Sequence, residues 1–292
     1  MTALASERTL QVVRAGPMST VQDRGRPRWA HLGVPRAGAL DAPAAALANR
    51  LVGNPPDAAV LEVTFGGLSV RPSQTVTVAV TGAPGPVAVD VRAAAWGEPV
   101  SVRAGRLLQV GTPTVGVRSY LAVAGGIAVA PVLGSRSTDT LAGIGPPVLA
   151  DDDELPLGAS AEPPASIGVA AVRQDGDPGR TGLRVLPGPR LDWFAEDAWT
   201  TLTRATYTVQ AESNRVGVRL QGPRLVRSRH EELASEGIVL GAVQVRASGL
   251  PLVFLADHPT TGGYPVIAVV HPDDLWRCAQ LRPGEPLTFH PA

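Results

Sequence analysis

The sequence predicts a mainly β protein in two parts, built as barrels or sandwiches of short strands rather than as a parallel α/β sheet. Many short apolar runs occur, and Gly, Pro, Asn or Asp separates most of them. Apolar and polar residues alternate through Thr75–Val80, as expected of a half-buried strand. A stretch rich in small residues, Pro and Gly interrupts the chain around residues 161–180.

The expected strands follow these apolar runs in both parts of the chain. Besides 75–80 they are Leu10–Val13, Val87–Val91, Leu107–Val110, Leu121–Val123, Tyr207–Val209, Val216–Leu220, Leu252–Leu255 and Val266–Val270.

Few helices are expected. Asp41 can cap a helix that runs to about Val52, where Gly53 and Pro55 stop it. Its apolar stripe would consist of Leu40, Ala44, Leu47 and Leu51. Two more helices are expected at Asp273–Leu281 and at about Trp193–Leu202.

The expected domains are residues 1–160 and 181–292, joined by a linker at 161–180. Each part contains an Arg-x-Gly turn followed by a strand, at Arg103–Val110 and at Arg282–Phe289. This similarity indicates two related β modules.

Composition excludes several kinds of chemistry. All 26 basic residues are Arg, so the chain offers no lysine to carry biotin, form a Schiff base or act as a P-loop lysine. The formal net charge of zero lacks the basic excess typical of a nucleic-acid binder.

The remaining sequence signals favour a cytoplasmic protein without a metal. Cys278 is the single cysteine, so no disulfide within the chain is expected. The five histidines show no metal-ligand spacing, and the first residues do not resemble a signal peptide. The longest uncharged run is short and broken by Gly and Pro, which makes it a poor membrane span.

Polar residues gather in three clusters that are candidates for a functional site. The first contains Gln22, Asp23 and Arg26, followed by His31 and Arg36; it can equally be an Asp–Arg network in a surface loop.

The second cluster is Asn214-Arg215, which is either a plain turn or a guanidinium fork for a carboxylate. The third joins two apolar strands, with Glu236 and Gln244 as further candidates for the same cavity. It consists of His258, Thr260, Thr261, Gly262, Gly263 and Tyr264.

At these clusters the chain resembles the biotin-dependent carboxyltransferase family. That family is also called allophanate hydrolase subunit two, and it includes the C subunit of 5-oxoprolinase and KipA-like proteins. The similar segments are GPMSTVQDRGRPRWAHLGVPRAGALD, ANRLVGNPPDAAVLEVTFGG, RSYLAVAGGI, PVLGSRSTDTLAGIG, GPRLDWF, SNRVGVRL, EELASEGIVLGAVQV and DHPTTGGYPVIAVV. They cover nearly the whole chain in order.

The resemblance implies two cyclophilin-like β-barrel modules and a part in a larger complex. The implied partners are the B subunit of 5-oxoprolinase, which is KipI-like, and its A subunit, which is of the LamB/YcsF type. The implied reaction opens 5-oxo-L-proline to L-glutamate with hydrolysis of ATP, whose location in the complex stays open. No biotin is expected on this chain.

Under that reaction, the candidate residues receive roles as hypotheses. Arg26 or Arg215 would anchor the substrate carboxylate, and Asp23, His31 or His258 would act as general acid or base. Residues 260–263 would bind an oxyanion or phosphate. These segments are expected to converge on one small anionic substrate.

Two alternatives remain open at this point. The chain can be a carboxyltransferase subunit of a biotin-dependent urea or amide carboxylase, which receives carboxybiotin from a separate carrier. It can also be a non-enzymatic KipA-like regulator that binds a KipI-like protein.

Overall fold

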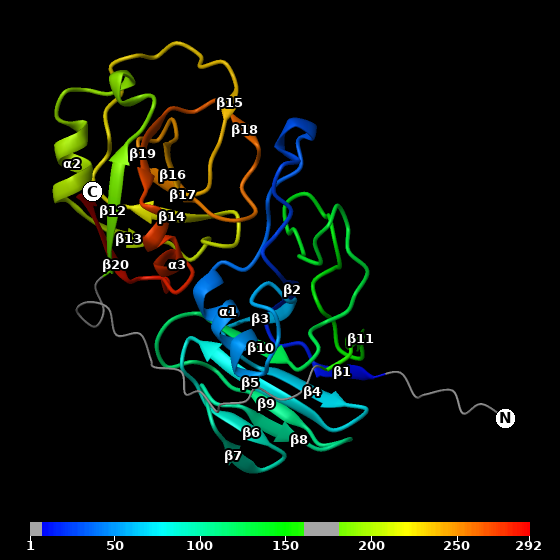
Figure 1. The fold of residues 1–292 in the computed structure, drawn as a ribbon. Coiled ribbons are helices and arrows are strands. Elements are labelled where there is room, and N and C mark those ends of the chain that lie inside the picture. Colours follow the sequence, from blue (N-terminus) through cyan, green and yellow to red (C-terminus); the bar gives the residue numbers. More distant parts are fainter. Residues whose placement is uncertain (1–7, 161–180) are drawn as a thin grey trace. The chain divides into compact units, whose positions relative to one another are not determined.

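The computed structural model describes residues 8–160 and 181–292, which fall into two compact units. We call residues 8–26, 41–139 and 143–160 the N-terminal unit, and residues 27–40, 140–142 and 181–292 the C-terminal unit. The expected linker, 161–180, lies outside the described residues. Both units are mainly β with a few short helices, as the sequence predicts (Figure 1).

The strands of the N-terminal unit form two sheets. The six-stranded sheet contains, in spatial order, β11 (Glu154–Pro156), β1 (Thr9–Arg14), β4 (Leu68–Pro72), β9 (Leu108–Val110), β6 (Val87–Val89) and β7 (Arg92–Ala94). The five-stranded sheet contains β2 (Met18–Gln22), β3 (Val60–Thr64), β10 (Arg118–Val123), β5 (Val76–Gly82) and β8 (Val100–Val102). Their facing apolar side chains make one core, in which Val12 and Val70 belong to the first sheet and Leu61 and Leu121 to the second.

The five-stranded sheet is buried on both faces. Neighbouring residues of a strand point to opposite faces, so Leu121 enters the core while Tyr120 points away from it. Tyr120 is fully buried all the same, and its hydroxyl donates to Glu62 Oε2 (2.9 Å) and accepts from the backbone N–H of Asp41 (2.7 Å). Burial, together with the nearby Glu62 charge, raises the pKa of Tyr120 well above its ordinary value.

Helix α1 (Ala42–Leu51) packs on β5, β10 and β3, which explains this second buried face. The predicted N-cap is confirmed, because the Asp41 side chain accepts from the backbone N–H of Ala44 (3.0 Å). The predicted apolar stripe is displaced, because the buried side chains of the helix are Ala45, Ala48, Asn49 and Leu51.

The C-terminal unit is built around a closed seven-stranded barrel. Its strands are, in order, β12 (Thr181–Pro187), β19 (Val266–Val270), β16 (Ala242–Val245), β17 (Pro251–Phe254), β14 (Gly217–Gln221), β13 (Thr206–Val209) and β20 (Pro286–Pro291). The first and last strands along the chain, β12 and β20, pair in parallel and close the barrel. A separate ribbon pairs β15 (Glu236–Gly237) with β18 (Thr261–Gly262).

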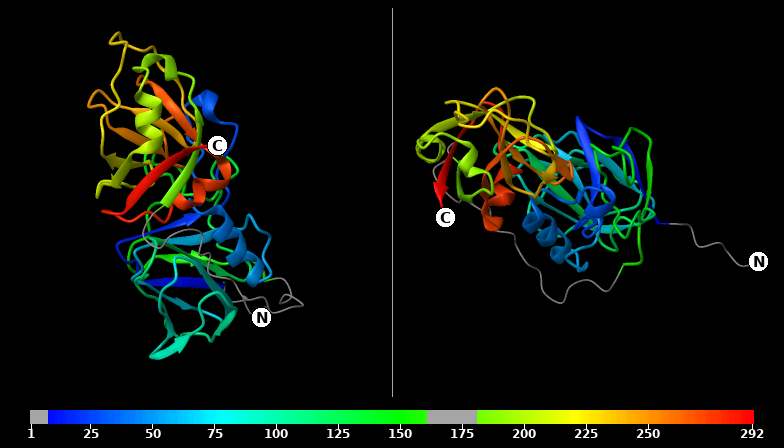
Figure 2. Two further views of the ribbon diagram at one scale, coloured as in Figure 1. Left: turned by 90° about the vertical axis from the view of Figure 1, so that its left-hand side faces the viewer. Right: turned by 90° about the horizontal axis from the view of Figure 1, so that it is seen from above.

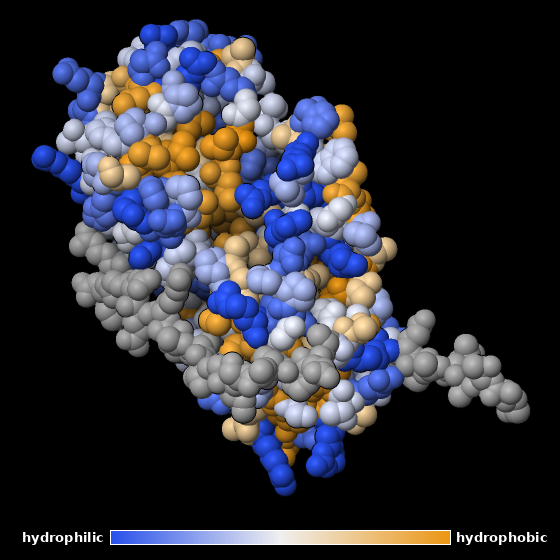
Figure 3. Space-filling view, in the orientation of Figure 1, coloured by the Kyte–Doolittle hydropathy of each residue, from blue (hydrophilic) through white to orange (hydrophobic). Residues whose placement is uncertain are grey.

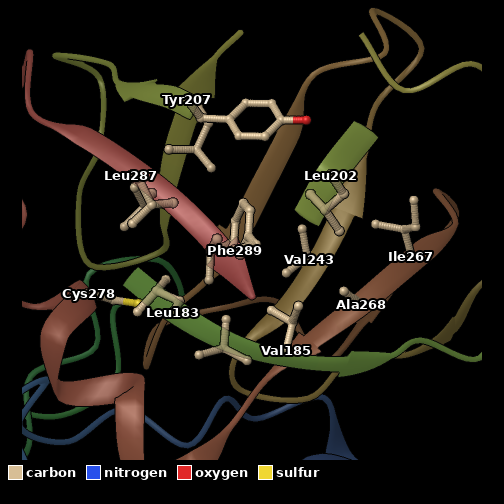
Figure 4. Close-up of a cluster of buried hydrophobic side chains, with 14 of the residues drawn as sticks. Leu183, Val185, Leu202, Tyr207, Val243, Ile267, Ala268, Cys278, Leu287 and Phe289 are labelled. Carbon is tan, nitrogen blue, oxygen red and sulfur yellow. The ribbon is translucent and has the colours of Figure 1, made fainter. Parts of the chain in front are cut away.

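The barrel interior is apolar and densely filled. The rings of Tyr207 and Phe289 meet edge to face, with centroids 5.8 Å apart. Leu202 of helix α2 (Ala198–Arg204) points into the same cluster (Figure 4), and α2 lies beside β20 (Figure 2, left). The side chain of Cys278, on α3 (Leu275–Cys278), is also buried there.

The remaining helix predictions were right in place but not in extent. The expected helix at 193–202 divides into a 3-10 turn η2 (Leu191–Trp193) and α2, because Phe194 is extended between them. The expected helix at 273–281 is a 3-10 turn η3 (Pro272–Asp274) followed by α3. A third 3-10 turn, η1 (Ala30–Leu32), lies in residues 27–40. Among the described residues, no helix has the length and apolar character needed to cross a membrane.

Candidate functional site

A small apolar surface lies on the outer side of the barrel. Val253 of β17 belongs to the barrel interior, so its neighbours Leu252 and Phe254 point outward. They join Ala242, Val266 and Ile238 in a second cluster. Figure 3 shows an apolar area over the strands that Figure 1 labels β16 and β17. We call this cluster, in which Ile238, Ala242, Phe254 and Val266 are buried, the outer apolar face.

The β15–β18 ribbon contacts the outer apolar face through Ile238, which directly follows β15. Glu236 pairs with Gly262 across the ribbon. A Cβ at Gly262 would lie 2.6 Å from Ile238 Cδ1 and 3.1 Å from Gln244 Nε2, so this glycine permits a close approach. The structure thus brings Glu236, Gly262 and Gln244 together.

The polar residues at the edge of the outer apolar face, which we call its polar rim, are Glu236, Gln244 and Tyr264. Hydrogen bonds, an ion pair and a cation–π contact fix their positions. Gln244 is buried, and its Nε2 donates to the carbonyl of Tyr264 (2.9 Å). The Glu236 carboxylate pairs with Arg190, whose Nε lies 3.0 Å from Oε2. The guanidinium of Arg227 lies 5.4 Å from the centroid of the Tyr264 ring. Each contact fixes a residue of the rim to a neighbouring element.

His258 lies next to the outer apolar face, with its ring 6.2 Å from that of Phe254. It is 7% exposed, and its Nδ1 lies 2.8 Å from the carbonyl oxygen of Pro259. A carbonyl only accepts hydrogen bonds, so Nδ1 carries a proton in this contact.

A buried ion pair fixes the start of the His258 loop. Arg215 and Asp257 are 1% and 0% exposed, and Nε and Nη2 of Arg215 donate to the two carboxylate oxygens at 3.0 and 2.9 Å. Thr140 adds its N–H (3.0 Å) and its hydroxyl (2.6 Å) to Asp257 Oδ2. Arg215 Nη2 also donates to the carbonyl of Gly38 (2.7 Å). The Arg215–Asp257 pair therefore links its own two segments to Thr140 and to Gly38.

Residues 27–40 run beside the same loop. The backbone N–H of Ala37 donates to the carbonyl of Ala256 (3.0 Å), which places Arg36 next to this junction. The side chains of Arg36 and His31 are exposed, and the His31 ring stacks near Trp29, with centroids 6.3 Å apart. Asn214 makes the predicted turn, because its Oδ1 accepts from the N–H of Val216 (2.9 Å).

Gln22, Asp23 and Arg26 belong to the N-terminal unit, where all three bond to residues 132–138. Gln22 Nε2 donates to the carbonyl of Thr138 (3.0 Å). Asp23 Oδ1 accepts from the hydroxyls of Ser135 and Ser137, both at 2.6 Å, and Oδ2 accepts from the N–H of Arg136 (2.7 Å). The guanidinium of Arg26, 1% exposed, donates to the carbonyl of Ser137.

Of the three clusters, the second and third contact each other within the C-terminal unit, and their convergence on one substrate stays a prediction. Asn214-Arg215 and residues 257–264 meet at the Arg215–Asp257 pair. Thr140, Phe254, Ile238, Arg190 and Arg227 complete this site and were missed, because no local pattern marks them. Within the described residues, no group of His, Cys, Asp and Glu side chains is arranged to hold a metal ion.

Comparison with known proteins places this arrangement among related sequences. Residues 32–291 match the model of the carboxyltransferase domain, subdomain A and B. The chain is 41% identical over 283 residues to the C subunit of 5-oxoprolinase from Escherichia coli, covering 96% of this chain and 90% of that protein. It is 31% identical to urea amidolyase of Saccharomyces cerevisiae, covering 97% of this chain and 16% of that protein.

Solved structures share the fold. The crystal structure of TTHA0988 superimposes with a TM-score of 0.88 at 38% identity, covering 99% of this chain. The urea amidolyase of K. lactis gives a TM-score of 0.90 at 29% identity. The chain spans 57% of the first of these chains and 19% of the second, so both carry additional protein.

Proposed function

Because the chain belongs to the carboxyltransferase-domain family, subdomains A and B, we propose that it is the C subunit of an ATP-dependent 5-oxoprolinase complex. The proposal rests on how much of each relative's own length this chain matches. Two relatives named as this subunit of 5-oxoprolinase, at 41% and 34% identity, match over 90% and 87% of their own length. The complex would open 5-oxo-L-proline to L-glutamate, with a KipI-like subunit and a LamB/YcsF-type subunit for partners.

The outer apolar face has features that suit such a substrate. 5-Oxoproline is a small ring with a lactam and a carboxylate, so it needs an apolar floor, an amide partner and a cation. Phe254 and Leu252 offer the floor, and Gln244 is a buried amide at its edge. We assign the anchoring cation to Arg36, because Arg215 is engaged inside the unit by Asp257.

His258 is the residue that we assign to proton transfer. Opening the lactam adds water to the carbonyl carbon, breaks the C–N bond and leaves a protonated amine. The imidazole can accept a proton from the water and return it to the leaving nitrogen. The Arg215–Asp257 pair fixes the backbone just before His258 and thereby its position.

ATP would supply the activation of the lactam oxygen in the complex. No residue of this chain is assigned to the nucleotide, and the absence of lysine excludes a P-loop lysine from it. The cytoplasmic location expected from the sequence stays a prediction, which fractionation of the cells would test.

Glutamate release from 5-oxoproline and ATP tests the proposed function. The purified chain is mixed with the KipI-like and LamB/YcsF-type subunits of the same organism, and each protein is omitted in turn. We expect glutamate only when all three are present. The proposal fails if the two other proteins release it at the same rate without this chain.

A second candidate is a carboxyltransferase that acts on urea within a biotin-dependent complex. It is supported by the urea amidolyase match, at 31% identity over 97% of this chain. The test adds urea, bicarbonate, ATP, a biotin carboxylase and a biotinylated carrier to the chain and measures ADP. If this alternative holds, ADP release depends on urea. If the chain is the 5-oxoprolinase subunit, urea has no effect on ADP release. Binding to a KipI-like protein without either activity would favour the non-enzymatic regulator.

A further inference from the structure

The outer apolar face is covered by another part of the C-terminal unit. Phe254 and Val266 are buried, although both side chains point away from the barrel interior. Ile238, which directly follows β15, belongs to the same cluster. The β15–β18 ribbon (Figure 1) therefore lies over this face.

The segment that contains β15 is anchored at both ends. Leu233, before β15, packs against the barrel core. After β15, the backbone N–H of Gly241 donates to the carbonyl of Phe254 (2.9 Å). Residues 234–240 therefore lie between two fixed points.

Between these points the ribbon is thin. β15 and β18 form two residue pairs, Glu236 with Gly262 and Gly237 with Thr261. Gly237 and Thr261 are exposed, and a Cβ at Gly237 would meet no atom within 4 Å. A small number of buried contacts is typical of segments that open without unfolding the rest of a domain.

A weak contact holds the ribbon on the barrel. The backbone N–H of Arg190 donates to the carbonyl of Val266 on β19 (3.1 Å). Its guanidinium pairs with the Glu236 carboxylate through both oxygens, with Nε 3.0 Å from Oε2. The two side chains are 36% and 27% exposed, so water screens their attraction. Such a pair can break and reform at low cost.

The surface under the ribbon contains a polar group as well as apolar ones. Val243 and Val245 point into the barrel, so Gln244 between them points outward. Its Nε2 donates to the carbonyl of Tyr264, which fixes the orientation of the amide. Within the part of the chain that the structure describes, no group donates to Gln244 Oε1. A buried acceptor of this kind points to a ligand that supplies an N–H group.

We propose that the β15–β18 ribbon is a lid, which opens to admit a ligand with an N–H group to the outer apolar face. The Arg190–Glu236 ion pair is its latch, and Ile238 closes it. A lid of this kind excludes water from the bound ligand and holds it in place. That the ligand is 5-oxoproline, whose lactam carries the N–H, rests on the proposed function, whereas the opening of the lid does not.

Thiol labelling of the purified chain measures the opening directly. Val266→Cys places a thiol under the ribbon, and Cys278, buried in the barrel core, reports unfolding of the barrel in the same molecule. We expect the introduced thiol to react at least about tenfold faster than Cys278. Its rate should barely depend on urea, because lid opening exposes little surface, whereas the rate of Cys278 should rise steeply with urea.

The latch is tested in the same Val266→Cys background. Glu236→Gln removes the charge of the latch at nearly constant size, and we expect the introduced thiol to react about two- to fivefold faster. Glu232→Gln is the matched control, because it removes an exposed negative charge from the same segment, and it should leave the rate unchanged.

The ligand is tested by protection of the same thiol in the complete complex. 5-Oxoproline should slow the labelling of the thiol introduced by Val266→Cys. The analogous lactone, in which oxygen replaces the N–H, should need at least about a tenfold higher concentration for the same protection.

Locking the ribbon tests whether its opening serves the reaction. In the double variant Arg190→Cys/Glu236→Cys, a bifunctional reagent that forms disulfides joins the two positions, while Cys278 stays buried. We expect the complete complex containing the joined chain to release glutamate at least about tenfold more slowly than with the unjoined chain. A reductant should restore the rate.

The outcomes of these measurements are distinct. The lid is overturned if the introduced thiol reacts no faster than Cys278, if Glu236→Gln has no effect, or if the joined chain is as active as the unjoined one. Equal protection by the lactone overturns the N–H requirement. If the complete wild-type complex releases no glutamate while the labelling rates are as expected, the proposed function fails and the lid stands.

Discussion

Individual side chains show where sequence reasoning identifies the right chemistry but not the partner. The sequence leaves two alternatives for Asn214-Arg215, a plain turn or a guanidinium fork for a substrate carboxylate. In the structure the fork holds the carboxylate of Asp257, which lies 42 residues away along the chain. Thr140, which bonds to the same carboxylate, is 117 residues away from it. Contacts at such separations leave no local pattern, so the sequence could not reveal this pair.

Arg215→Ala should destabilise the C-terminal unit strongly. It leaves the Asp257 charge buried without its guanidinium, which costs about 3–5 kcal/mol of unfolding free energy. Thr140→Val removes one hydrogen bond to that charge and should cost about 2 kcal/mol. Urea denaturation of the purified chain measures both.

Arg219 offers a matched control for this prediction, since it is half-exposed on β14. Arg219→Ala should change the unfolding free energy by no more than about 0.5 kcal/mol. If Arg215→Ala lowered the unfolding free energy by less than about 1 kcal/mol, the Arg215–Asp257 pair would not be what fixes the His258 loop.

At the scale of elements, the alternation of apolar and polar residues and the positions of turn residues predict the strands well. Each expected strand overlaps an observed one, because alternation and flanking Gly or Pro act locally. Helix limits were less predictable, since the expected helices at 193–202 and 273–281 each divide into a 3-10 turn and a shorter α-helix. The two Arg-x-Gly turns also correspond in detail. Arg106 N–H bonds to Arg103 O, and Glu285 N–H bonds to Arg282 O, both at 3.1 Å.

The attachment of η3 and α3 to the barrel should depend on pH. Burial raises the pKa of Asp274, but hydrogen bonds from Arg184 outweigh burial, so the net pKa lies below its ordinary value. A lowered pKa in the folded state stabilises the fold above the unfolded pKa, about 3.9. This stability is lost as the pH falls through the folded pKa.

Asp274→Asn therefore should lower the unfolding free energy at pH 7 and much less at pH 3. Urea titrations of wild type and variant at pH 7, 4 and 3 provide the comparison. Asp273→Asn is the control, because that side chain is 75% exposed. A difference between Asp274→Asn and wild type that is the same at every pH would contradict the role given to Arg184.

For the whole molecule, the sequence predicts the fold class and the family, and the structure adds which segments belong together. Residues 27–40 and 140–142 belong to the C-terminal unit, although they lie far along the chain from its barrel strands. The expected site divides in the same way. His258 and Gln244 lie at the outer apolar face, whereas Asp23 and Arg26 support a turn in the other unit.

The central claim is that the outer apolar face of the barrel is where 5-oxoproline reacts. The most direct test is kcat/KM for glutamate release by the complete complex containing His258→Gln, beside His290→Gln as control. His290 is exposed on β20 and should tolerate the change within about twofold. The account predicts a loss of about 100-fold or more for His258→Gln. Activity within about twofold of wild type for His258→Gln would contradict it.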